Sequence, residues 1–308
     1  MKFYFAPLEG IAGYVYRNAH HAYFDNIDKY FSPFVVPNQN ARLKTKELKD
    51  VLPENNTGIN LVPQIMTNNA KDFIHTAHKF KQLGYEECNL NLGCPSGTVV
   101  SKFRGSGFLR KPKELDVFLD EIFAADVMKI SVKTRIGFSN PEEFFELIDI
   151  YNKYPIEELI IHPRTREDYY KNKPNLEIFK EAIRLSKNPL CYNGDICSVQ
   201  DYNTFVQAFP DINSIMIGRG LLRNPGLIDD IKNNNKTNLK IMKEFHDKIY
   251  EDYKLVLSGG HNVLYKMKEL WNFMIPTVTE NDNYLKKIRK ADRLTEYDKI
   301  IADIFGDR

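Results

Sequence analysis

A strand pattern followed by a helical pattern recurs eight times up to Ile231, and this repeat restricts the possible folds more than any other feature of the chain. The strand patterns are short apolar or alternating runs, the third interrupted by Pro63. They occupy residues 3–6, 30–36, 59–66, 88–92, 128–134, 158–162, 189–192 and 214–217. Strands that alternate with helices form parallel sheets, and eight such units close into a barrel of about 250 residues. We therefore predict the α/β class and a (β/α)8 TIM barrel.

The rest of the chain carries helical patterns only. Asn233, Asn234 and Asn235 form a polar break, which is typical of a linker. Helical patterns follow at residues 239–257, 261–275, 283–290 and 296–305. This succession predicts a small C-terminal helical bundle of four helices. The predicted domains are therefore 1–234, the barrel, and 235–308, the helical domain.

Several cations gather near the end of the helical segment. They are Lys286, Lys287, Arg289, Lys290 and Arg293, and we call them the basic cluster. Such a run is either the solvated face of a helix or a surface for phosphate groups, and the pattern leaves both open. The whole chain has 43 Lys and Arg against 41 Asp and Glu, a net charge of +2. Because this total does not mark a nucleic-acid binder, any RNA surface must be a local patch.

The cysteines and the apolar runs bear on the environment of the protein. Four cysteines are present, at positions 88, 94, 191 and 197, without a C-x-x-C pair or a His at ligand spacing. This pattern predicts neither a disulfide framework nor a metal site. No apolar run approaches the roughly 18 residues of a membrane span, and the N-terminal run is too short for a signal peptide. We expect a soluble, cytoplasmic protein with reduced thiols.

One of these cysteines stands where a strand stops. The run Asn91-Leu92-Gly93-Cys94-Pro95 ends the fourth strand pattern, because its last three residues cannot extend a strand. Most free cysteines are small buried hydrophobes. At the carboxyl end of a barrel strand, however, loops carry the chemistry, so Cys94 is a candidate catalytic thiol. The next segment, residues 96–107, contains two cations and three glycines, and we expect a flexible loop that closes over an anionic group.

Polar residues mark the ends of other strands. Gln64, near the end of the third, either binds a flat heterocycle through its amide or satisfies barrel backbone. Lys133 and Arg135 share parity at the end of the fifth strand, and two cations on one face require an anion. His162 ends the sixth strand and is followed by two arginines, Arg164 and Arg166. A lone His is more often structural, but the arginines favour contact with phosphate or RNA.

Glycine-containing turns follow the last two strands. They are Asn193-Gly194-Asp195 and Gly218-Arg219-Gly220. The loops after strands seven and eight form the usual phosphate site of such barrels, where backbone amides bind the phosphate. Each turn is a weak signal alone, but the two together predict a phosphate site.

These segments together resemble one family. The runs APLEG, NLGCP, RGSGFL, VKTRIG, HPRTR, NGDI and IGRGLLRNP, together with Gln64 and the helical tail, are similar to the bacterial, FMN-dependent tRNA-dihydrouridine synthases over nearly the whole chain. The resemblance implies FMN across the barrel mouth, NADPH as its reductant, and an enzyme that reduces the 5,6 double bond of uridines in tRNA. It also implies that residues 1–234 are the catalytic part and 235–308 the RNA-binding part, in a protein we expect to be monomeric.

The resemblance also assigns roles to residues. The predicted flavin contacts are Pro7, Gln64, Lys133, His162, Asn193, Gly194, Asp195, Gly218 and Arg219. Cys94 is the expected proton donor and Asn91 faces the uracil, while Arg135 and Arg166 lie near the RNA. As a proton donor Cys94 must hold its proton, so we expect burial to keep its pKa near or above the usual range. One departure is Asn89, which stands where the family often has an acid.

Three other functions remain open at this point. Ribosomal RNA is an alternative substrate. A second alternative is an FMN barrel oxidoreductase that acts on a small pyrimidine, although the helical tail and its basic cluster argue against it. The third is an RNA-binding protein that has kept the barrel without catalysis.

Overall fold

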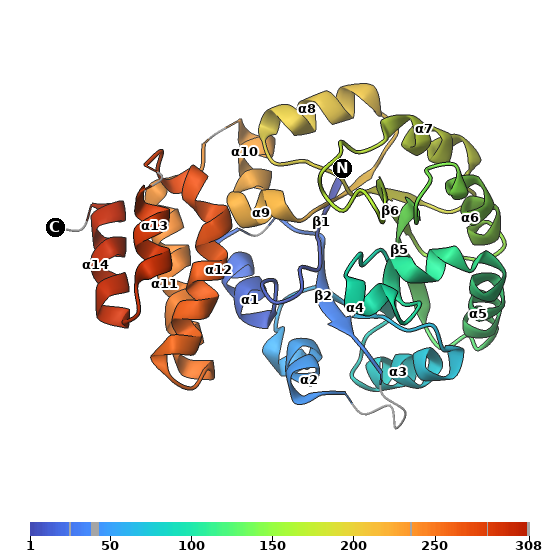
Figure 1. Ribbon diagram of the computed structural model, residues 1–308, viewed down its shortest axis with the longest axis horizontal. Coiled ribbons are helices and arrows are strands. Elements are labelled where there is room, and N and C mark those ends of the chain that lie inside the picture. Colours follow the sequence, from blue (N-terminus) through green and yellow to red (C-terminus); the bar gives the residue numbers. More distant parts are fainter. Residues whose placement is uncertain (25, 38–42, 235, 282, 307–308) are drawn as a thin grey trace.

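The computed structural model describes residues 1–24, 26–37, 43–234, 236–281 and 283–306. Eight parallel strands close into a barrel in chain order, from β1 to β8 and back to β1, and Figure 1 shows helices around them. The strands are β1 Lys2–Phe5, β2 Lys29–Val35, β3 Leu61–Ile65, β4 Glu87–Leu92, β5 Lys129–Gly137, β6 Leu159–Thr165, β7 Leu190–Tyr192 and β8 Ser214–Ile217. The predicted (β/α)8 barrel is confirmed.

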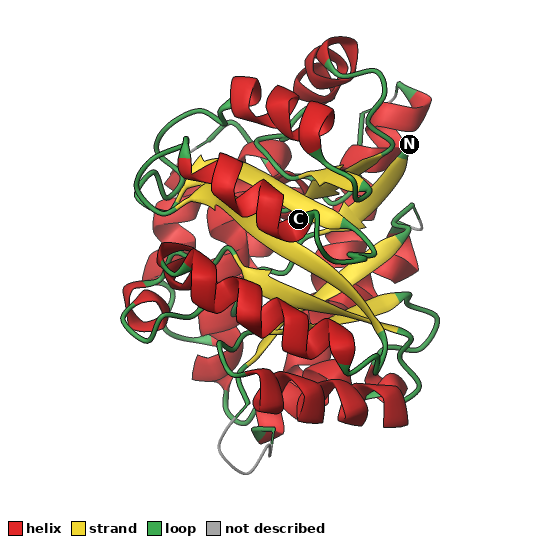
Figure 2. Cartoon of the chain, turned by 90° about the vertical axis from the view of Figure 1, so that its right-hand side faces the viewer, coloured by secondary structure: helices red, strands yellow, loops and turns green. Residues whose placement is uncertain are grey.

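The helices that follow the strands cover the outside of the barrel, as Figure 2 shows. They are α1 Tyr14–Tyr23, α2 Thr45–Val51, α3 Ala70–Gln82, α4 Gly97–Val100, α5 Pro112–Ala124, α6 Glu143–Tyr151, α7 Leu176–Leu185, α8 Val199–Ala208, α9 Arg219–Arg223 and α10 Leu227–Asn233, with 3-10 turns η1 Pro53–Asn55 and η2 Gly105–Arg110. Side chains cap three of them: Asn69, Asn175 and Ser198 each accept a hydrogen bond from a backbone N–H in the first turn of α3, α7 and α8.

Two proline positions differ from the prediction. The third strand is not interrupted, because β3 runs through Pro63, and β6 continues past His162 through Pro163 to Thr165. In both places the neighbouring pair of strands shifts its register, between Phe31 and Phe34 and between Arg135 and Gly137. Such irregularities accommodate a proline that cannot donate to the ladder. Arg164, expected after the sixth strand, therefore belongs to β6, and Arg135 lies within β5, which continues to Gly137.

The barrel interior is packed rather than open. A small cluster fills it: Tyr4, Ala6, Phe31, Val62, Ile160, Cys191 and Met216, each at most 5% exposed. A larger apolar core lies between the strands and the surrounding helices. Since the centre is solid, a ligand can only bind at an end of the barrel.

Four helices follow the barrel, as predicted: α11 Leu239–Val256, α12 Gly260–Val278, α13 Asn283–Lys290 and α14 Leu294–Phe305. They lie beside α1 and α9 in Figure 1, and α11 packs on α1 through Phe245, whose ring contacts Tyr16 and Phe24. Asn235, at the predicted boundary, lies outside the described residues, so the division into two domains stays a prediction. Nowhere in the described part of the chain is there a helix long and apolar enough to cross a membrane.

Candidate active site

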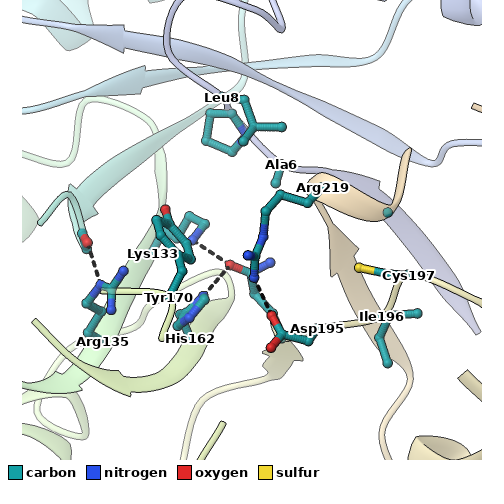
Figure 3. Close-up of a pocket in the computed structure, with 16 residues that line it drawn as sticks. Ala6, Leu8, Lys133, Arg135, His162, Tyr170, Asp195, Ile196, Cys197 and Arg219 are labelled. Atoms are coloured by element: carbon teal, nitrogen blue, oxygen red, sulfur yellow. Dashed lines mark hydrogen bonds and ion pairs between the residues drawn. The ribbon is translucent and has the colours of Figure 1, made fainter. Parts of the chain in front are cut away.

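A pocket with a cavity of about 70 Å³ lies at the carboxyl ends of the strands (Figure 3). Strand ends bring together residues that are far apart in the sequence. The predicted site residues that line the pocket are Pro7, Lys133, Arg135, His162, Asn193, Gly194, Asp195, Gly218 and Arg219. Three others, Gln64, Asn91 and Cys94, are joined to it through Gly93, which is itself part of the wall. Arg166 lies outside the pocket wall.

Asn193 organises one side of the pocket. Its Oδ1 accepts hydrogen bonds from Lys133 Nζ at 2.6 Å and from His162 Nδ1 at 3.4 Å, and its Nδ2 donates to the carbonyl of Met216 at 2.8 Å. The three side chains come from β5, from β6 and from the end of β7. Asn193 therefore holds the ammonium and the imidazole at fixed positions in the pocket.

The charge states of these two groups follow from their surroundings. Burial, and then the charge of Arg135, lowers the pKa of Lys133 to about 8, so the ammonium is still largely protonated at pH 7. Burial and the charges of Arg135, Lys133 and Arg164 hold the pKa of His162 well below its usual range, so the imidazole is neutral. Arg164 Nη1 lies 3.1 Å from His162 Nε2 and can only donate, so the proton is on Nδ1. Lys133 is the cationic donor of the pair.

Two arginines share the carboxylate of Asp195, which also lines the pocket. Arg164 is buried and donates to both oxygens of Asp195, while Arg219 donates to one of them. Burial alone would raise the pKa of Asp195, but the bonds and charges of the two arginines outweigh it and lower the pKa. Arg219 is about one third exposed, so its remaining N–H groups can face the pocket. Asp195 thus holds the Arg219 guanidinium beside the two glycine turns.

The two glycine turns bring main chain close to the pocket. A Cβ on Gly220 would stand 2.2 Å from the carbonyl oxygen of Ile196, and one on Gly194 would stand 2.0 Å from the hydroxyl of Tyr192. Neither distance is possible, so both positions require glycine. At Gly220 it allows the loops after β7 and β8 to approach each other, and at Gly194 it leaves room for the Tyr192 ring. Main chain and Arg219 together form a cradle for an anion.

Cys94 is held by a hydrogen-bonded turn. Asn91 Oδ1 accepts from the backbone N–H groups of Gly93 and Cys94, each at 3.0 Å, and Asn91 Nδ2 donates to Gln64 Oε1 at 2.7 Å. Gln64 in turn donates to Asn89 Oδ1 at 2.7 Å. In this structure the amides of Gln64 and Asn91 therefore position the turn. An amide nitrogen has two hydrogens, so Asn91 can still donate to a ligand.

The Cys94 thiol has a raised pKa. Burial is the main cause, and it outweighs the opposing effects of the Ser96 backbone and of Arg135. The direction agrees with the sequence-based expectation, and the thiol keeps its proton at neutral pH. Segment 96–107, predicted as a flexible loop, contains helix α4 and the start of η2: Gly105, Ser106 and Gly107 are buried there, and Ser106 donates to the carbonyl of Cys94 at 2.8 Å. The segment supports the turn because packing against β4 orders it.

Arg135 is buried and points at main chain. Its Nε donates to the carbonyl of Gly93 at 2.9 Å, and its Nη1 donates to the carbonyls of Thr165 and Tyr169. Its guanidinium also lies 5.4 Å from the ring of Tyr170, which itself stands 4.7 Å from Arg219. Figure 3 shows Tyr170 between these two arginines at the mouth of the pocket.

Two residues of the site were not assigned a role in it from the sequence. Arg164 was noted only as a candidate for phosphate or RNA contact, whereas in the structure it contacts His162, with which it shares parity on β6, and Asp195. Tyr170, which lines the pocket, could not be found, since it stands in the irregular segment after β6. In the described part of the chain no three His, Cys, Asp or Glu side chains group around a possible metal ion.

The fold and the site define a class of protein. A (β/α)8 barrel whose carboxyl-end pocket combines a cationic lysine, a neutral histidine and an anion cradle, with a protonated thiol beside it, is typical of an enzyme that uses an anionic cofactor. Residues 4–303 match the model of the family described as dihydrouridine synthase (Dus), and the chain belongs to this family. It is therefore an oxidoreductase, as predicted, and membership brings with it a flavin cofactor and a nicotinamide reductant.

Individual relatives agree with this assignment. The chain is 26% identical over 266 residues to the probable tRNA-dihydrouridine synthase 2 of Bacillus subtilis (strain 168), covering 82% of this chain and 78% of the relative. It is 28% identical over 240 residues to the probable tRNA-dihydrouridine synthase of Staphylococcus aureus (strain COL), covering 72% and 69%.

Solved structures with the same fold are more distant in sequence. Morphinone reductase in complex with tetrahydroNAD has a TM-score of 0.54 at 12% identity, over 77% of this chain and 88% of that one. The old yellow enzyme from Trypanosoma cruzi has a TM-score of 0.54 at 8% identity, over 77% and 89%. At this identity the likeness concerns the fold.

The residues present suit a flavin. The cradle formed by the two glycine turns and Arg219 matches a phosphate, because it offers main chain and a guanidinium without a side chain in the way. The Lys133 ammonium lines the same pocket, and a flavin ring that gains negative charge on reduction would require a cation there. Apolar Pro7 and Leu8 also line the pocket.

Proposed function

We propose that this chain reduces the 5,6 double bond of uridines in tRNA, with FMN as the flavin, NADPH as the reductant and Cys94 as the proton donor. The observation that carries the proposal is the protonated thiol of Cys94, fixed in a turn whose Gly93 forms part of the wall of a pocket built for an anionic cofactor. The names of the curated relatives support tRNA as the substrate.

The residues of the pocket then have separate tasks. Gly194, Gly218 and Arg219 hold the phosphate, while Lys133 and His162 contact the ring, with Pro7, Gln64, Asn193 and Asp195 completing or supporting the cofactor site. The bound reduced flavin supplies a hydride to carbon 6 of the uracil. Cys94 gives its proton to carbon 5, and the resulting thiolate takes a proton from solvent, so the ring gains two electrons and two hydrogens in total.

The substrate is oriented by the groups around the thiol. Asn91 retains a donor for a uracil carbonyl, and Arg135, whose guanidinium also hydrogen-bonds Tyr170, is the proposed contact for the RNA beside it. A uridine stacked in RNA cannot enter this pocket, so the base must be flipped out at a cost of a few kcal/mol, which phosphate contacts offset. Arg166 and the basic cluster on and after α13, all five residues of which are exposed, are the proposed sources of those contacts.

This proposal includes the assignments that rest on the resemblance. Residues 1–234 form the FMN-binding catalytic barrel and 235–308 the RNA-binding helical domain, in a monomeric cytoplasmic protein. Ribosomal RNA remains the nearest alternative substrate, and a small pyrimidine the next. Mapping dihydrouridine across all RNA from cells lacking the gene separates the first from tRNA, and NADPH oxidation stimulated by tRNA but not by free uracil excludes the second.

The direct test is to replace the thiol. In Cys94→Ala, reduction of the flavin by NADPH should be unchanged, while dihydrouridine formation in tRNA falls by about 10²-fold or more, the usual loss for a missing general acid. Cys88→Ala is the matched control, because it removes a thiol of the same strand, β4, that packs in the apolar core and does not line the pocket. Equal product from Cys94→Ala and the wild type would remove the proton-donor role. A wild-type protein that makes no dihydrouridine in any RNA would refute the proposed function.

A further inference from the structure

Cations and aromatic rings alternate along one rim of the barrel mouth. The row consists of Lys111, Phe103, Arg110, Phe138, Arg166 and Tyr169, and we call it the cation–aromatic row. Its members come from the loops after three neighbouring strands, β4, β5 and β6. Residues from 103 to 169 are thus brought into one line by the barrel.

The spacing along the row is that of cation–π contact. Lys111 Nζ lies 4.5 Å from the centre of the Phe103 ring, and the Arg110 guanidinium lies 4.7 Å from the same ring. Arg110 also lies 4.6 Å from the Phe138 ring. The Arg166 guanidinium stands 5.3 Å from Phe138 and 4.9 Å from Tyr169. Each ring therefore separates two cations or ends the row, and repulsion between the arginines is offset by the rings between them.

The backbone is strained where two of the three rings are placed. Phe103 has a φ of +51° and Tyr169 a φ of +50°, which bulky side chains rarely adopt. Such strain persists only where the surroundings impose it, and it concentrates at functional sites. Both rings are also more than one third exposed, so burial of apolar surface does not account for their positions.

The guanidinium groups of the row keep free donors. Neither Arg110 nor Arg166 forms an ion pair with any residue that the structure describes, and within the same residues Arg166 Nε is buried without a hydrogen-bond partner. A guanidinium held between two rings has its planar faces covered, so it can bind a further ligand only through its N–H groups. Arg110 uses one Nη2 donor on the Val100 carbonyl at 3.4 Å, and Lys111 is paired with Glu114 at 2.7 Å. The remaining N–H groups of Arg110 and Arg166 are the ones that can bind phosphates in pairs of hydrogen bonds.

The row leads to the pocket. Tyr169 is followed by Tyr170, which stands at the pocket mouth between Arg135 and Arg219. The row lies across the barrel from the helical tail, because β4 to β6 are opposite β8 and β1, whose helices α9 and α1 carry the tail (Figure 1). The row therefore borders the pocket on the side away from the helical tail.

We propose that the cation–aromatic row binds the single-stranded nucleotides next to the reduced uridine, with the edges of Arg110 and Arg166 on successive phosphates. This inference rests on the proposed function and adds a second RNA surface on the rim opposite the helical tail. The rings hold the guanidinium groups in place, so little freedom is lost when the phosphates bind. Phe103 and Tyr169 are each more than one third exposed, so an unpaired base can stack against them.

The test is the affinity of the flavin-loaded protein for an unmodified tRNA transcript, measured over a range of salt concentrations. Arg110→Gln should weaken binding about 5- to 10-fold and reduce the slope of log affinity against log salt by about 0.7, the value for one phosphate on a single strand. Arg184→Gln is the matched control, because it removes an equally charged, exposed side chain from the outer helix α7. It should leave both quantities at the wild-type value.

Two further variants separate the row from a simple positive patch. Arg110→Lys keeps the charge but loses the planar edges, and Phe138→Leu keeps every charge but removes the ring between the arginines. Each should weaken tRNA binding about 3- to 5-fold. Reduction of the flavin by NADPH without RNA should be the same in all variants, which also shows that they fold.

The outcomes distinguish the two proposals. If the wild type makes dihydrouridine and Arg110→Gln binds tRNA with the wild-type affinity and salt slope, the row has no part in RNA binding. If only Arg110→Gln is impaired while Arg110→Lys and Phe138→Leu bind as the wild type does, the site is a charge patch and the proposed stacked geometry is wrong. A wild type without product in any RNA overturns the proposed function and this inference together.

Discussion

The buried charge of Lys133 is expected to lower the free energy of unfolding, and the variant Lys133→Met tests this directly. The pKa of Lys133 falls from an ordinary value near 10.4 to about 8, because the folded chain buries the ammonium close to Arg135. A lowering of this size corresponds to about 3 kcal/mol at neutral pH. The hydrogen bond that Lys133 donates to Asn193 offsets about 1.5 kcal/mol of this cost. Lys133→Met should therefore be about 1 to 2 kcal/mol more stable than the wild type at pH 7.

The difference in unfolding free energy between Lys133→Met and the wild type should depend on pH. Below pH 8 the folded protein must carry the charged ammonium, so the penalty is complete. Between pH 8 and about 10.4 the folded chain releases this proton while the unfolded chain still holds it, so the unfolding free energy of the wild type rises relative to the variant. The advantage of Lys133→Met should thus disappear by about pH 10.

Urea unfolding followed by circular dichroism measures the difference, on protein stripped of flavin so that cofactor binding adds nothing. Lys129→Met is the matched control, because Lys129 begins the same strand and its side chain is 61% exposed. Its effect should stay within about 0.5 kcal/mol at every pH. A Lys133→Met variant that is less stable than the wild type at pH 7, or a gap that does not narrow above pH 8, would refute the reasoning.

Three further outcomes are expected. Asn91→Ala removes the two hydrogen bonds from Gly93 and Cys94 to its side chain, so the unfolding free energy should fall by about 2 kcal/mol. Dihydrouridine formation should drop more than flavin content does, and normal product yield would show that the bonds from Ser106 and Arg135 suffice to hold the turn. Gly220→Ala should lose flavin and have a lower melting temperature, because its Cβ would stand 2.2 Å from the Ile196 carbonyl. Gly97→Ala, with open space around it, should behave as the wild type. Equal flavin absorbance in the two variants would contradict the proposed anion cradle. Changing three lysines of the basic cluster to alanine should weaken tRNA binding and flatten its salt slope by up to about 3, and an unchanged slope would leave the cluster a solvated helix face.

The amino-acid sequence alone determined the architecture and most of the pocket wall. Each of the eight strands and four tail helices is encoded locally, as an apolar period bounded by proline, glycine or a capping residue, so it can be identified without knowing what it packs against. Parallel strands of a barrel all end at the same face, and Lys133, His162, Asn193 and Arg219 therefore had to meet.

Only the tertiary structure decided how these side chains are paired. The hydrogen bonds of Arg164 to Asp195, like those from Asn91 to Gly93 and Cys94, depend on which atoms the register of the strands brings within 3 Å. A register shift in β5 changes such distances without any sign in the local pattern. The sequence thus predicts where the strands end, but it does not predict which side chains are paired at those ends.

The same reason explains the cation–aromatic row. Its phenylalanines and arginines are unremarkable in their own segments, because no local period relates Phe103 to Phe138 or Arg110 to Arg166. They form a line only because three adjacent parallel strands deliver their loops side by side, and because Phe103 and Tyr169 adopt backbone conformations that no local preference favours. Local periodicity determined the barrel, whereas contacts between distant loops decided the surface that it presents to a ligand.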